Sequence, residues 1–175
     1  MSLLAEFLNR EADRLATERP TREAEVAEWR AAVDALFRQL TDWIRAADAK
    51  GVASVSVGQT TLREHRLGVY PMPTLTVDVD GEAVTFSPKS HGVGGRVVPD
   101  GEGRFRYPKP GDPPAAEVTL GGRVDVMSGV TAVTHLYRLA GEWVVWQPRA
   151  FEPTEGRFAP LTRERFEALL VRGLQ

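Results

Sequence analysis

Three histidines, His65, His91 and His135, are the side chains of this sequence best suited to acid–base or metal chemistry. Imidazole titrates near neutral pH and is a common metal ligand. No two of the histidines fall within one helical turn or one strand, and no HExxH motif occurs. The spacing therefore predicts no catalytic histidine and no metal site. His135 alternates with apolar neighbours, which favours a hydrogen-bonded histidine in a strand.

A glycine-rich segment, residues 90–96 (SHGVGGR), is the first place to look for a small-ligand site. Backbone N–H groups in such a loop can bind an anion, and Arg96 adds positive charge. A phosphate-binding loop, however, ends in Gly-Lys-Ser/Thr and leads into a helix, whereas a strand-like segment follows here. A flexible or bulged connection explains the segment better. For a pocket at the mouth of the sheet, the candidate ligand-binding residues are His91, Arg96, His135 and Tyr137.

Two other short motifs have plain structural explanations. Residues 104–107 (RFRY) alternate arginine with aromatics, which suits single-stranded nucleic acid, but a strand with one solvated and one buried face gives the same alternation. Residues 78–82 (DVDGE) resemble the start of a calcium loop but lack its third acidic ligand and its distant glutamate. We therefore expect a hairpin turn at Asp80-Gly81, and nucleic-acid binding is the least favoured function.

Composition excludes several classes of chemistry. The 175 residues include no cysteine, which removes disulfides, thiolate nucleophiles and cysteine-ligated metals. The formal net charge of −2 provides no strong field to gather nucleic acid or anionic lipid. No Gly-x-Ser-x-Gly, Walker, Rossmann or kinase signature is present. We expect no cofactor, and the balance is against an enzyme.

The sequence also predicts no association with a membrane. The N-terminus meets a carboxylate at Glu6, where a signal peptide would show a basic start and a long apolar run. No apolar stretch approaches the roughly 20 residues of a membrane span. We therefore expect a cytoplasmic protein.

The secondary-structure elements that must position these side chains follow from a change in composition near residue 50. The segment before it is rich in alanine and glutamate, and the segment after it holds all 16 glycines. The first part predicts helices over about 2–18 and 22–49. Pro20 separates them, because proline lacks the N–H that continues a helix. We favour two helices, and one long helix kinked at Pro20 is the alternative.

The second of these helices has the strongest pattern in the sequence. Its apolar residues are spaced alternately by three and four positions, which makes a heptad seam. The seam faces the interior of the same chain, forms a dimer interface, for which tryptophans are typical anchors, or does both if the stripe is wide enough. The candidate interface residues are Val26, Trp29, Val33, Leu36, Leu40 and Trp43.

After residue 50, short alternating segments predict about seven strands. The clearest are two hairpins, one at Asp80-Gly81 and one at Ala140-Gly141-Glu142. Tight turns imply an antiparallel sheet, because parallel pairs need long crossovers. Thr162 then caps a closing helix over about 163–172. We thus predict an α+β fold: an N-terminal helical pair (1–50), then a curved antiparallel sheet closed by a C-terminal helix (51–175), together forming one structural unit.

Three functions follow from these observations. The strong seam and the scarcity of reactive motifs favour a non-catalytic protein-interaction or scaffold module that self-associates, as a homodimer, or binds a protein partner through its N-terminal helices. The alternative is a small-molecule-binding domain or enzyme with a pocket on the sheet, which requires His91 and His135 to converge. The third is a weak nucleic-acid-binding module.

Overall fold

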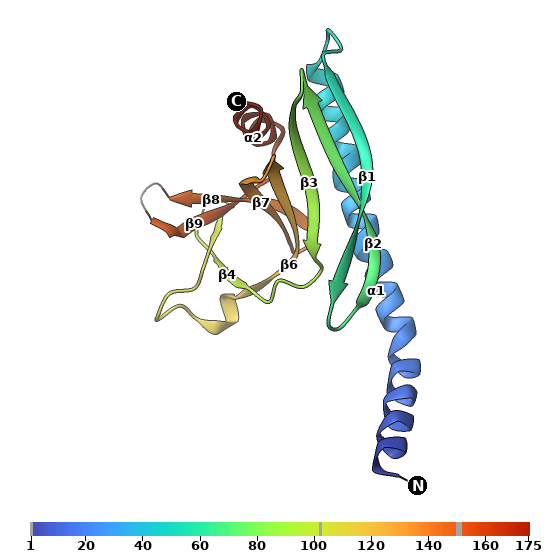
Figure 1. Ribbon diagram of the computed structural model, residues 1–175. Helices are drawn as coiled ribbons and strands as arrows, with labels where there is room; N and C mark the ends of the chain where they lie inside the picture. The colour runs from blue at the N-terminus through green and yellow to red at the C-terminus, as the bar shows by residue number, and fades with distance from the viewer. Residues whose placement is uncertain (1, 102, 150–151) are drawn as a thin grey trace.

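The computed structural model describes residues 2–101, 103–149 and 152–175 and shows an α+β fold (Figure 1). These residues form two α-helices, one 3-10 turn and nine strands. The helices are α1 (Leu3–Ala47) and α2 (Arg163–Gly173), and the 3-10 turn is η1 (Pro114–Ala116). The strands are β1 (Ala53–Glu64), β2 (Gly68–Val79), β3 (Glu82–Ser90), β4 (Arg96–Pro99), β5 (Phe105–Arg106), β6 (Val118–Ser128), β7 (Thr131–Leu139), β8 (Glu142–Arg149) and β9 (Glu152–Pro160).

The strands form one antiparallel sheet that closes on itself at one end. Their order is β1-β2-β3-β6-β4-β5-β9-β8-β7, and β6 pairs with β7 as well. The strands from β6 to β7 therefore make a closed six-stranded barrel, while β1, β2 and β3 extend from it. Strand β6 belongs to both parts, because residues 118–119 pair with β4 and residues 123–128 pair with β3.

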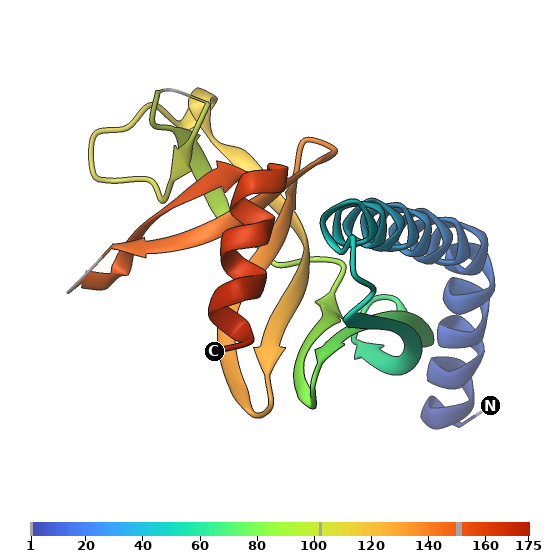
Figure 2. The same ribbon diagram turned by 90° about the horizontal axis from the view of Figure 1, so that it is seen from above.

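Two apolar clusters hold these parts together. The larger lies where α1 and α2 pack on the sheet and includes Trp29, Phe86 and Phe166. The smaller gathers on the opposite face of the barrel strands, around Tyr137 and Phe158. Both helices pack on the larger cluster, and Figure 2 shows α2 beside the barrel strands while α1 lies along β1 and β2. The two faces of β6, β7 and β8 are thus both occupied where the barrel is closed.

The prediction of two N-terminal helices is wrong: α1 is one helix that continues through Pro20. Figure 2 shows its axis bending in the blue N-terminal part, which contains Pro20, so the structure matches the kinked alternative. Ion pairs of Glu18 with Arg14 and Arg22 connect the turns on either side of the proline. Pro20 is exposed, so water can satisfy the carbonyl that loses its helical donor.

Both predicted hairpins are confirmed. The turn between β2 and β3 is Asp80-Gly81, and the turn between β7 and β8 is Ala140-Gly141. All four residues have positive φ angles, from 50° to 90°, as tight two-residue turns require. The closing helix is also confirmed, since the Thr162 side chain accepts a hydrogen bond from the Arg165 N–H at 3.4 Å.

The strand count and the barrel differ from the prediction. The sequence pattern predicts about seven strands and a curved sheet, whereas the described residues hold nine strands and a closed barrel. The missed strand is β9, whose sequence EPTEGRFAP contains two prolines and a glycine, residues that are depleted in strands. Without β9 the barrel cannot close, because it joins β5 to β8.

Within the described ranges, no helix has both the length and the apolar character needed to cross a bilayer.

Candidate functional site

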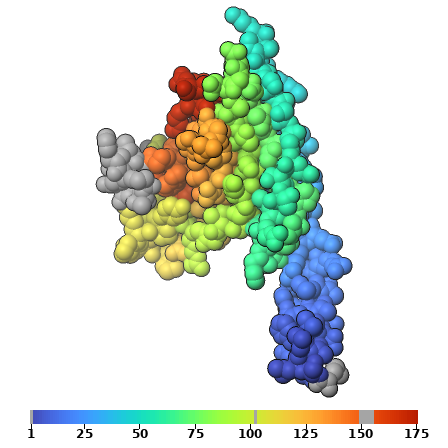
Figure 3. Space-filling model, in the orientation of Figure 1, coloured from blue at the N-terminus to red at the C-terminus, as the bar shows by residue number. Residues whose placement is uncertain are grey.

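The N-terminal part of α1 extends beyond the sheet with its apolar side chains exposed. Figures 1 and 3 show this blue segment standing clear of the rest of the molecule. Leu3 is 86% exposed and Phe7 is 53% exposed, which is unusual for large apolar residues on a helix. We call this surface the apolar stripe, and its residues are Leu3, Leu4, Phe7, Leu8 and Leu15.

The heptad seam further along α1 faces the chain's own sheet. Trp29, Val33, Leu36 and Leu40 are all at most 1% exposed. Trp29 lies 5.9 Å from Trp143 of β8, measured between ring centroids. These four side chains are buried against their own sheet, so in this structure they offer no exposed surface to a partner. Val26 and Trp43 are half-buried at the edges of the same cluster.

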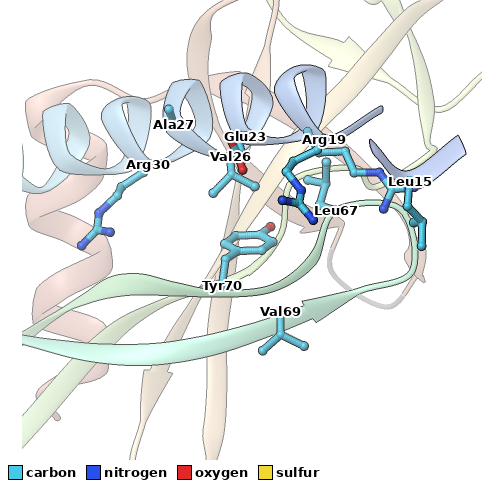
Figure 4. A pocket seen from close by; sticks show the side chains of 10 residues that line it. Leu15, Arg19, Glu23, Val26, Ala27, Arg30, Leu67, Val69 and Tyr70 are labelled. Carbon is cyan, nitrogen blue, oxygen red and sulfur yellow. The ribbon is translucent and has the colours of Figure 1, made fainter. Parts of the chain in front are cut away.

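A groove joins the exposed and the buried parts of α1. It has a volume of about 540 Å³ and lies between α1 and the β1–β2 hairpin (Figure 4). Its apolar surface comes from Leu15, Val26, Leu67, Val69 and Tyr70. Its charged rim comes from Arg19, Arg22, Glu23 and Arg30. Because Leu15 belongs to both, the groove and the apolar stripe form one continuous surface.

Glu64 holds the hydroxyl of Tyr70, one of the residues that line this groove. Its Oε1 accepts hydrogen bonds from the Tyr70 hydroxyl and from the His91 backbone N–H, the latter at 3.0 Å. Burial, together with the hydrogen bond to Glu64, raises the pKa of Tyr70. The His91 ring lies edge-on to Trp29 at 6.0 Å. His91 is thus a packing residue beside the seam.

A separate polar cluster lies on the barrel face of β6 and β7. Asp125 is buried, and its Oδ1 is 2.6 Å from Arg123 Nε and 2.9 Å from His135 Nδ1. Burial acts to raise the pKa of Asp125, but the hydrogen bonds to His135 and Arg123 outweigh it and the pKa is lowered. Arg123 Nη2 also lies 3.3 Å from His135 Nδ1. The Asp125 carboxylate can only accept, so a proton on Nδ1 is donated to it, and no hydrogen bond of Nε2 is found among the described residues.

Aromatic rings adjoin this polar cluster. The rings of His135 and Tyr137 are 6.3 Å apart, and Tyr137 lies edge-on to Phe158 at 5.4 Å. Trp146 packs on Phe158 at 4.6 Å, and Tyr107 contacts both. An imidazole with a free nitrogen beside aromatic rings can position a planar or hydrogen-bonding ligand.

The four predicted ligand-binding residues thus do not form one site. His135 and Tyr137 are neighbours, but His91 lies beside Trp29 in the other cluster. Arg96 is exposed and pairs with Glu117 at 2.9 Å. His65 is an exposed residue of the turn between β1 and β2. The convergence of His91 and His135, which the small-molecule hypothesis required, is absent.

Sequence reasoning missed Asp125 and Arg123. The signal was present, because Arg123 and Asp125 stand two positions apart in a strand and so share a face. It also missed the exposure of the apolar stripe, since periodicity shows that a helix has an apolar face but not what covers that face.

The cationic segment 104–107, of which only residues 105–106 form strand β5, is partly neutralised by its own chain. Arg106 donates to Asp112 at 2.6 Å and 2.9 Å, and its Nε is 3.6 Å from Asp100. An arginine engaged in this way contributes little to phosphate binding.

In the part of the chain that the structure describes, no group of three or more His, Asp or Glu side chains could hold a metal ion. Comparison with known proteins returned no matching family model, no matching curated protein and no matching solved structure.

Proposed function

We propose that this chain is a self-associating protein-interaction module and that the projecting part of α1 is its contact surface. The observation that carries the proposal is the apolar stripe on a helix that has extended past its own sheet. Exposed contiguous apolar patches on soluble proteins mark interaction sites.

Helix energetics support this function. An isolated helix of fewer than about 15 residues is marginal in water, and most helical stability comes from packing of an apolar face. The projecting segment has the Arg14 ion pairs with Glu11 and Glu18, but exposed ion pairs contribute little to stability because water screens them. A partner that covers the stripe would supply the missing packing.

The charges of the segment favour a protein partner over a lipid surface. Residues 2–19 contain four acidic side chains (Glu6, Glu11, Asp13 and Glu18) and three basic ones (Arg10, Arg14 and Arg19). Helices that lie on membranes carry mostly Lys and Arg on their polar face. A mixture of both signs is instead suited to pairing with a second copy of the same segment.

Sedimentation velocity tests the proposal. We expect the wild-type chain to associate at micromolar concentration and Leu8→Glu to be monomeric with an unchanged thermal melt at low concentration, because Leu8 is exposed. Asn9→Glu is the matched control, since it adds the same charge to the opposite face of the helix. A wild-type chain that stays monomeric at every concentration would overturn the proposal.

A second candidate function is small-molecule binding on the barrel face. It is supported by the juxtaposition of the His135 imidazole with Tyr137 and the Asp125 carboxylate. We expect small aromatic carboxylic acids, used as probes, to shift the NMR signals of the neighbouring Tyr137 ring, and His135→Asn to abolish that response. The absence of any shift at millimolar probe would argue against it.

A further inference from the structure

The apolar stripe, the groove and the buried seam all lie on one face of α1. Leu4, Leu8, Leu15, Val26 and Trp29 are separated by 4, 7, 11 and 3 residues, and each of these spacings is close to a whole number of helical turns. Figure 2 shows that the bend in α1 turns the projecting part toward the side on which β1 and β2 lie. One face of the helix is therefore exposed first, then borders the groove, and then becomes buried.

The positions along this face are symmetric about Leu15. Leu4 lies eleven residues before Leu15, and Val26 lies eleven residues after it. At about 1.5 Å per residue, each is roughly 16 Å away along the helix. In the same way, Glu11 and Arg19 each lie four residues from Leu15.

We infer that a second copy of the chain packs its projecting helix antiparallel to the first, with the twofold axis near Leu15. This inference rests on the proposed self-association and specifies its geometry. Leu4 of each copy enters the groove of the other, where Val26, Leu67 and Tyr70 form the apolar surface. One contact then covers the stripe and the groove of both chains.

The charges on this face match the antiparallel arrangement. It places Glu11 opposite Arg19 of the second copy. Both contacts of Arg14 with Glu11 use Oε2, which leaves Oε1 available. Arg19 is exposed and has no ion-pair partner within the described residues.

A parallel pair would not satisfy the same groups. It would place Arg19 against Arg19 and Leu4 against Leu4, and it would leave both grooves empty. Like charges directly opposite each other destabilise a helix pair, and the grooves would keep their apolar surface in water. The structure therefore favours the antiparallel pair.

Cysteine cross-linking distinguishes these geometries, because the chain has no cysteine of its own. We expect an equal mixture of Glu11→Cys and affinity-tagged Arg19→Cys chains to form a mixed disulfide on mild oxidation, at least fivefold more than either variant alone. Leu4→Cys should not cross-link with itself. Asp13→Cys, at an exposed position on the opposite face of the helix, measures random collision.

Charge exchange gives a second readout that does not need a disulfide. Glu11→Arg and Arg19→Glu should each weaken dimerisation about fivefold or more, as expected for losing exposed ion pairs. The double variant that carries both changes restores the opposite charges across the interface and should recover most of the affinity. Recovery is specific to the antiparallel pair.

The outcomes separate this inference from the proposed function. If Leu4→Cys cross-links with itself and the mixture does not, the chain self-associates through the stripe but the antiparallel geometry is wrong. If neither Leu4→Cys nor the mixture of Glu11→Cys and Arg19→Cys cross-links, and sedimentation shows only monomer, both proposals fail. If the mixture alone cross-links and the double variant recovers, the antiparallel dimer is supported.

Discussion

Asp125 is the residue on which the polar cluster of the barrel depends. It is the buried acceptor of both Arg123 and His135, so its removal leaves two donors without their acceptor. A buried acceptor shared by charged donors contributes more than an ordinary hydrogen bond does. Asp125 therefore holds the His135 imidazole in place, independently of any ligand.

We expect Asp125→Asn to lower the free energy of unfolding by about 2 kcal/mol at pH 7. The pKa of Asp125 is lowered in the folded state, so its charge stabilises the fold above the ordinary aspartate pKa of about 4 and this stabilisation is lost as the pH falls through the folded pKa. The difference between wild type and variant should therefore shrink below about pH 4. Urea denaturation across pH 3–8 measures it, with exposed Asp13→Asn as the control. A difference that stays constant with pH would contradict this account.

Gly122 shows how closely α1 packs on the sheet. A Cβ atom at this position would lie 2.1 Å from Cη2 and Cζ3 of Trp29, which is fully buried. The indole cannot move away without displacing its neighbours in the core. Glycine is thus required at this point of β6.

Gly122→Ala is expected to destabilise the protein by about 3 kcal/mol, since overpacking a well-packed core forces side chains and backbone to shift. Gly92→Ala is the matched control, because a Cβ there meets nothing within 4 Å. Thermal unfolding compares the two. Equal melting temperatures would mean that Trp29 is not held against β6 as described.

At the scale of the element, α1 combines two roles in one helix. Its second half packs on the sheet, whereas its first half contacts little of its own chain. Pro20 lies between them, where the helix bends. The proline therefore sets the direction in which the apolar stripe projects.

Replacing Pro20 with alanine should restore a helical hydrogen bond and remove the clash of the ring with the preceding turn. Because proline inside a helix costs about 3 kcal/mol, we expect amide exchange in residues 10–22 to slow by at least tenfold. Thr21→Ala, a neighbouring exposed change, controls for helix propensity. Unchanged exchange at these amides would show that Pro20 does not limit the stability of the segment.

At the scale of the whole molecule, the stability of the two core clusters does not depend on the projecting part of α1. The two core clusters contain no residue before Val26. Removal of residues 2–14, which carry all of the stripe except Leu15, should therefore leave both cores intact.

A chain that lacks residues 2–14 is expected to unfold within about 2 °C of the full-length chain at low concentration, because exposed segments contribute little to stability. Only the full-length chain should gain stability as its concentration rises, since association stabilises the folded state by mass action. Calorimetry over a hundredfold range of concentration tests both points. A large drop in melting temperature for the truncated chain at low concentration would contradict this separation.

The sequence by itself determined the parts of this protein that depend on neighbours along the chain. The 3-4 spacing defined the helical face of residues 26–47, and Asp80-Gly81 and Ala140-Gly141 defined two hairpins, because turn chemistry and periodicity are local properties. The cap at Thr162 is local in the same way.

Only the tertiary structure decided the features that depend on residues far apart in the chain. Closure of the barrel requires β9 to join β5 to β8, and no local pattern in β9 indicates this. Periodicity placed Leu8 and Val33 on apolar helix faces alike, but the sheet ends before it reaches Leu8 and covers Val33. His135 meets Asp125 rather than His91 because β6 and β7 are paired in one register, which the tertiary contacts select.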